Sequence, residues 1–170
     1  LSLILYCTVP SQPERGPRTP YLKLIGSLFT LFVQERVLRV RAVLALLIFA
    51  DVTTLLTPMV LPLSASPYAL SHSTIGLFGL AGVAGALGAA RAGHWADRGL
   101  GERVTGIALA CMLIAWVPIG MLSSSLLWLV AGVLILDFGS QAVHVTNQGL
   151  IYGVRPEAQS RLTAAYMVFY

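Results

Sequence analysis

The lysines and arginines of this chain are confined to alternate connections between long apolar runs. All 11 lie outside these runs or at their ends, and the connections at residues 64–72 and 123–125 contain none. Short basic loops are retained in the cytoplasm during insertion. The pattern therefore predicts a multi-pass protein of the bacterial inner membrane whose cytoplasmic loops carry Arg15, Arg18, Lys23, Arg36, Arg39, Arg41, Arg91, Arg98, Arg103, Arg155 and Arg161.

Composition excludes a soluble globular fold. Hydrophobic residues make up 56% of the chain and charged residues 11%, and the mean hydropathy is +0.80. Too little polar surface remains to cover a soluble domain of this length. The net charge of +4 follows from the basic loops, so it indicates contact with the lipid bilayer and no nucleic-acid partner. Cys7 and Cys111 belong to no metal-spacing motif, and we expect no cofactor.

Four runs approach or exceed the length of about 20 residues that a helix needs to cross the hydrocarbon core. They occupy residues 42–63, 73–92, 104–122 and 126–154. A helix satisfies its own backbone hydrogen bonds in lipid, so the runs predict an all-α, polytopic transmembrane helix bundle. The short turns at 64–72 and 123–125 make the runs they join antiparallel neighbours. We assign residues 42–161 to this four-helix part.

Both ends of the chain are apolar but shorter than a span. Residues 1–9 lack the basic region of a signal peptide and are predicted to end a truncated transmembrane helix. Residues 162–170 are predicted to start another, so we expect an internal fragment of a larger membrane protein. Residues 10–41 are predicted to form a cytoplasmic linker. Its proline-rich first part precedes an interfacial amphipathic helix at residues 21–41.

The second run carries a glycine at every third position, from Gly76 to Gly88. Positions three apart in an α-helix drift around its axis, so small residues appear on several faces. Small residues allow helices in lipid to approach each other closely. The period predicts close packing of this helix against more than one neighbour.

The connection after the second run reads GHWADRGLGER, residues 93–103. It resembles the signature of the major facilitator superfamily of transporters, Gly-x-Leu-Ala-Asp-Arg-x-Gly-Arg-Arg, between helices two and three and again between eight and nine. Trp95 stands for the usual Leu, and Gly101 and Arg103 fit after a one-residue slip. The residues that match position by position are Gly93, Ala96, Asp97 and Arg98.

That slip is typical of the second copy of the signature. The whole chain therefore resembles the C-terminal half of a bacterial drug or sugar efflux transporter, from helix six to the start of helix eleven. The resemblance implies an N-terminal bundle of the same parent chain as partner. It also implies a conformational role in a cytoplasmic gating loop for Gly93, Asp97, Arg98, Gly101 and Arg103. Taken alone, these residues also fit a solvated hairpin, because exposed ion pairs contribute little.

Asp51 lies within the first run, ten residues from Arg41. At 1.5 Å per residue this places it about 15 Å from the interface, near the middle of the bilayer. A carboxylate there must be paired, protonated or in contact with water. We interpret Asp51 as a proton or substrate site, the alternative being a neutral Asp hydrogen-bonded to a neighbouring helix.

The fourth run carries a polar stripe at Asp137, Gln141, His144 and Gln148. The spacing i, i+4, i+7 and i+11 places these residues on one face of a helix, which cannot face lipid. Counting about 16 Å from Arg155 puts His144 level with Asp51 and Asp137 nearer the outer side. Since His titrates near neutrality, the series predicts a proton and substrate pathway along a central cavity. An Asp/His metal site is a competing interpretation that lacks a recognisable third ligand.

These features predict a secondary active transporter rather than an enzyme. We expect proton-coupled efflux, that is antiport, of a small drug-like or sugar-like molecule by alternating access. A solute uptake symporter of the same fold is the first alternative, because fold does not decide direction. Two further alternatives are a non-transport subunit that anchors a complex to the membrane and an intramembrane metalloenzyme.

Overall fold

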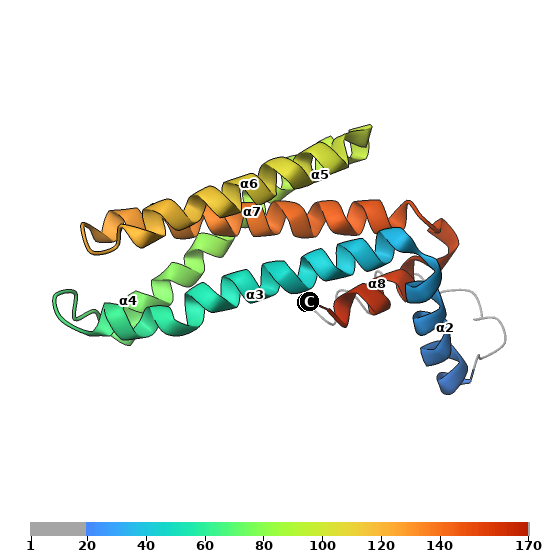
Figure 1. The fold of residues 1–170 in the computed structure, drawn as a ribbon, viewed down its shortest axis with the longest axis horizontal. Coiled ribbons are helices and arrows are strands. Elements are labelled where there is room, and N and C mark those ends of the chain that lie inside the picture. The colour runs from blue at the N-terminus through green and yellow to red at the C-terminus, as the bar shows by residue number, and fades with distance from the viewer. Residues whose placement is uncertain (1–19, 170) are drawn as a thin grey trace, which may run out of the picture.

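The computed structural model describes residues 20–169, and every regular element in that range is a helix (Figure 1). This confirms the predicted all-α class for the described chain. The predicted helix end at residues 1–9 and the first part of the linker lie outside it. The α-helices are α2 (Tyr21–Gln34), α3 (Arg36–Ser64), α4 (His72–Gly76), α5 (Ala81–Trp95), α6 (Gly101–Gly120), α7 (Leu126–Tyr152) and α8 (Gln159–Met167). The shorter turns are the 3-10 helices η1 (Leu77–Leu80) and η3 (Pro156–Ala158) and the π-helical turn η2 (Ala96–Leu100).

Three helical stretches of the described chain are long and apolar enough to cross a membrane. They are Arg36–Ser64, Gly88–Gly120 and Leu126–Tyr152. The middle stretch joins the end of α5 to α6 through a reversal at Gly99. Its φ of 81° lies in the left-handed region that glycine adopts without steric cost.

The second predicted run, residues 73–92, is not one continuous α-helix. It consists of α4, η1 and the greater part of α5. Gly76 and Gly79 lie at the interruption, and a Cβ atom added at either would meet nothing within 4 Å. Glycine is a poor helix former, and two glycines three residues apart weaken the α-helix at this point. The expectation of one unbroken helix is therefore wrong for this segment.

Helices α6 and α5 pack against two different sides of α7 (Figure 1). Helix α6 runs antiparallel to α7 and approaches its backbone at two glycines one heptad apart. A Cβ atom on Gly132 would lie 2.9 Å from the carbonyl oxygen of Ala115, and one on Gly139 would lie 2.9 Å from that of Ala108. These two glycines set the distance between the helices.

Helix α5 uses only part of its glycine period for packing. A Cβ atom added to Gly85 would come within 2.0 Å of the Asp137 carboxylate, and one added to Gly88 within 1.9 Å of the Phe138 ring. Nothing lies within 4 Å of such an atom at the three earlier glycines, Gly76, Gly79 and Gly82. The predicted close packing is therefore found against α7 and only in the second half of the period.

At the end of the bundle where α3 begins, α2 and α8 pack against α3 and against each other (Figure 1). The predicted amphipathic helix at residues 21–41 is divided, because α2 ends at Gln34 and α3 begins at Arg36. Glu35 lies at the break and forms an ion pair with Arg155, with 2.7 Å between Glu35 Oε1 and Arg155 Nε. An apolar core closes this end, and the residues buried in it are Leu31, Leu38, Ala45, Ile151, Leu162, Ala165 and Tyr166.

Topology can be tested with single cysteines at three exposed positions, Ser66, Ser124 and Arg98. In a background lacking Cys7 and Cys111, we expect an impermeant thiol reagent added to intact cells to label the cysteines at 66 and 124 only. Permeabilised cells should label all three, which controls for accessibility. Labelling at 98 with silence at 66 would reverse the orientation deduced from the basic loops.

Candidate functional site

The Asp137 side chain projects from α7 toward α3 and α5. It lines a cavity of about 140 Å³ together with Val52 and Leu55 of α3, Phe78 of η1 and Gly82 of α5. Among the described residues, its Oδ2 atom is buried and has no hydrogen-bond partner. A buried carboxylate oxygen without a partner is costly if the group is ionised. Asp137 is therefore the polar group in the described spans that most needs a proton or a ligand.

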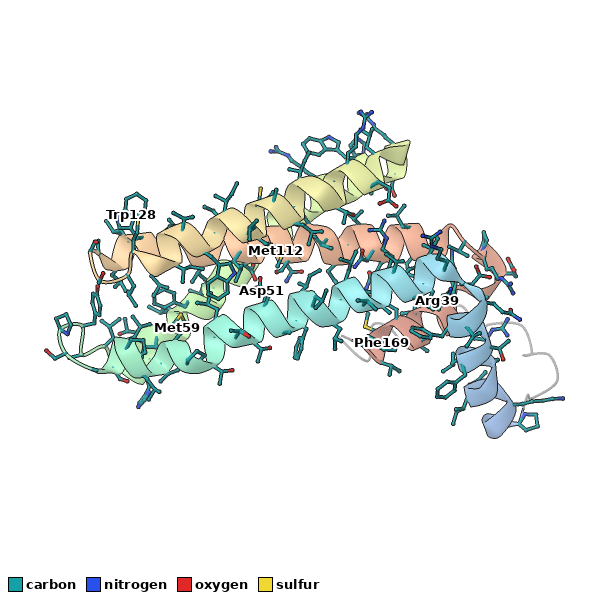
Figure 2. All side chains as sticks on the ribbon, in the orientation of Figure 1. Arg39, Asp51, Met59, Met112, Trp128 and Phe169 are labelled. Atoms are coloured by element: carbon teal, nitrogen blue, oxygen red, sulfur yellow. The ribbon has the colours of Figure 1, made fainter. Side chains whose placement is uncertain are left out.

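Asp51 is held differently. The Trp116 indole of α6 donates a hydrogen bond at 3.0 Å to Oδ1 of Asp51, which is labelled in Figure 2. Asp51 lines a separate groove of about 340 Å³ between α3 and α6, together with Leu47 and Leu113. The structure thus gives Asp51 the neighbouring-helix hydrogen bond that the sequence left as an alternative, and it does not place Asp51 and Asp137 in one cavity.

The depth assigned to Asp51 also changes. Arg41 of α3 hydrogen-bonds Asn147 of α7, and the two helices run in opposite directions. Asp51 and Asp137 each lie ten residues, about 15 Å, from that contact. Asp51 is therefore level with Asp137 and not with His144. Arg41 was predicted to lie at the interface, whereas in the structure it is buried inside the bundle.

The remaining stripe residues are half-buried and have different neighbours. Gln141 lines a groove of about 480 Å³ between α7 and α5, with His94 and Asp97 on its opposite side. His144 instead contacts α8, where the Tyr166 hydroxyl lies 3.2 Å from His144 Nδ1. Gln148 Nε2 lies 3.2 Å from His144 Nε2. The four residues predicted to share one face of α7 therefore lie in three different surroundings.

A polar network centred on Arg41 joins α3, α6 and α7. The Arg41 side chain is 4% exposed. Its Nη1 atom donates to Thr105 Oγ1 at 3.0 Å and to Asn147 Oδ1 at 3.3 Å. Its Nη2 atom pairs with Glu102 Oε1 at 2.5 Å. A buried guanidinium requires such partners, so these contacts fix how the three helices meet.

The network continues into α8. Asn147 Nδ2 donates to the Arg41 carbonyl oxygen and to the Tyr166 hydroxyl, each at 3.4 Å. Tyr166 in turn contacts His144, as described above. Predicted stripe residues are thereby connected to Arg41, which the sequence reasoning treated only as a loop charge.

Sequence reasoning missed Arg41, Glu102, Thr105, Tyr166 and Trp116 as partners of the site. One signal for Arg41 was available. Leu38, Arg41, Ala42 and Ala45 follow the i, i+3, i+4, i+7 spacing of one helix face, and all four are buried. The partners on other helices carry no such signal, because the contacts depend on the packing of α6 and α8 against α3.

The residues of the predicted gating loop separate into buried and exposed groups. Gly101 is buried against Leu150 of α7, and a Cβ atom at Gly93 would lie 3.1 Å from Val145. The charged members Asp97, Arg98 and Arg103 are exposed. Glu102, which lies between the matched positions Gly101 and Arg103, forms the ion pair with Arg41. In residues 20–169, no three His, Cys, Asp or Glu side chains group closely enough to hold a metal ion.

Long apolar helices that bury polar groups among themselves define a helical membrane protein. The chain is homologous to proteins described as uncharacterized transporter YgaY, from Escherichia coli strain K12 and from Escherichia coli O157:H7. Each is 46% identical over 170 residues, which is 100% of this chain and 43% of the relative. The chain thus spans less than half the length of these curated relatives. No family model matches the chain, and no solved structure matches it.

Proposed function

We propose that the chain forms part of a secondary active transporter of the major facilitator type, which exports a small molecule in exchange for protons. The observation that carries this proposal is the Asp137 carboxylate, whose buried oxygen has no hydrogen-bond partner in the described chain and faces a cavity between three helices. Proton binding would neutralise the group, and proton release would leave an isolated charge. The group therefore has two states of different energy, as a coupling site requires.

The relatives described as transporters support the same class. The rest of the transport cycle is proposed to follow from alternating access, in which this bundle moves against a second bundle of the parent chain. Under this proposal the gating-loop residues Asp97, Arg98 and Arg103 contact that second bundle. Their exposure in this structure is compatible with the role.

Asp51 and His144 have secondary roles in this proposal. Trp116 already satisfies one oxygen of Asp51, and His144 is held between Tyr166 and Gln148. We propose that they tune the environment of the cavity, whereas Asp137 carries the coupled proton. Uptake by symport on the same site remains the second candidate, because the carboxylate would bind a proton in either direction of transport.

The test is Asp137→Asn in the full-length protein, since Asn preserves volume and hydrogen bonding but cannot exchange a proton. In infrared difference spectra between acid and alkaline pH, the Asp137→Asn protein should lack the C=O band of one protonated carboxylic acid that the unmodified protein shows. The exposed Asp97→Asn, a matched control, should retain that band. Proteoliposomes that contain Asp137→Asn should show no accumulation driven by an imposed pH gradient for any member of a panel of drugs and sugars. An unchanged band and unchanged accumulation in Asp137→Asn would refute the assignment.

A further inference from the structure

A groove opens between the ends of α5 and α6 that flank the Gly99 reversal, and α7 forms its floor. Its volume is about 650 Å³, and its lining is apolar over most of its length. Ile107 of α6 forms part of the wall and is 64% exposed, and Phe138 of α7 is 43% exposed. Gly88 of α5 lets the Phe138 ring approach the helix backbone. In a membrane-spanning segment, such exposed apolar walls contact acyl chains.

One end of the groove is charged and aromatic. Arg91 and Trp95 of α5 line it, are both exposed and lie one helical turn apart. Among residues 20–169, no hydrogen bond or ion pair joins the Arg91 guanidinium to another group. A guanidinium at the edge of an apolar span is stabilised by an anionic partner, and the described chain provides none for Arg91.

The charged end of the groove lies toward the Gly99 reversal, and the long arginine side chain can extend from within the span toward the headgroups. Arg91 precedes Gly99 by eight residues, which corresponds to about 12 Å of helix. Trp95 lies between the two, where tryptophan is enriched at membrane interfaces. The basic loops place this side in the cytoplasm, where the leaflet contains anionic lipids.

We propose that this groove is a binding site for one anionic phospholipid of the cytoplasmic leaflet. The phosphate pairs with Arg91, the Trp95 indole lies beside the headgroup, and an acyl chain follows the wall formed by Ile107 and Phe138. The alternative occupant is a further helix of a longer chain, since the relatives extend well beyond the aligned residues. The guanidinium at the end of the groove favours a phosphate over an apolar helix. The proposal does not depend on transport activity.

Charge selectivity is tested by native mass spectrometry of the full-length protein, released from nanodiscs containing equal amounts of phosphatidylglycerol and phosphatidylcholine. We expect retained phosphatidylglycerol, which Arg91→Gln reduces about fivefold, the value of one basic residue at a lipid surface. Arg161→Gln removes one exposed charge from α8 and should leave retention unchanged. Equal retention of both lipids, or no effect of Arg91→Gln, would overturn the proposal.

A second measurement identifies the occupant directly. Benzoylphenylalanine at position 107 points a photoreactive group into the groove. Irradiation in native membranes should yield protein carrying a phospholipid mass adduct, and the adduct should decrease in Arg91→Gln. A cross-link to a peptide of the longer chain that lies outside these 170 residues would show that a helix fills the groove, and would overturn the lipid assignment.

Discussion

Replacing Gly139 of α7 with alanine should destabilise the protein by forcing α6 and α7 apart. The added Cβ would lie 2.5 Å from Met112 Cγ and 2.9 Å from the Ala108 carbonyl oxygen. The side chain could rotate away, but the backbone oxygen cannot. Helix α6 must therefore move, and overpacking of this kind costs about 1–3 kcal/mol.

The matched control is Gly149→Ala on the same helix, where nothing lies within 4 Å of an added Cβ. There the helix propensity of alanine should leave stability unchanged or raise it by up to about 1 kcal/mol. Thermal unfolding in detergent, followed by circular dichroism, measures both variants. Equal midpoints would mean that α6 and α7 are not in backbone contact at this position.

Replacing Arg41 with leucine should give the second large loss of stability. The substitution leaves the buried Asn147 Oδ1 without its donor and removes a hydrogen bond to the buried Thr105. An unsatisfied buried polar atom costs about 1–3 kcal/mol. The ion pair itself adds little, because the Glu102 side chain is 81% exposed. We expect a total loss of about 2–3 kcal/mol, dominated by the neutral partners.

Two further variants separate burial from charge. Arg36→Leu removes an exposed arginine from the first turn of the same helix and should change stability by less than about 0.5 kcal/mol. Arg41→Lys keeps the charge but cannot reproduce the planar fork that reaches three partners, so its loss should be intermediate. Unfolding midpoints in detergent rank the three proteins. An Arg41→Leu variant as stable as Arg36→Leu would contradict the network.

The site itself could be predicted only in part. The spacing of Asp137, Gln141, His144 and Gln148 identified one helix face, and each of these side chains is half-buried in the structure. Their division among separate surroundings was not predictable, because it depends on which helix packs beside each turn of α7. The Trp116–Asp51 hydrogen bond joins residues 65 apart and has no local signature.

The helical class and the membrane environment could be predicted from the residues alone, because hydropathy and backbone hydrogen bonding in lipid are properties of each segment. The turns at residues 64–72 and 123–125 could also be predicted, and the helices α3 and α6 end close to the expected positions. The interruption before α5, the burial of Arg41 and the separation of Asp51 from Asp137 became visible only in the folded chain. Each of these depends on contacts between helices distant in sequence, and a one-dimensional pattern of polarity does not encode which neighbour a side chain meets.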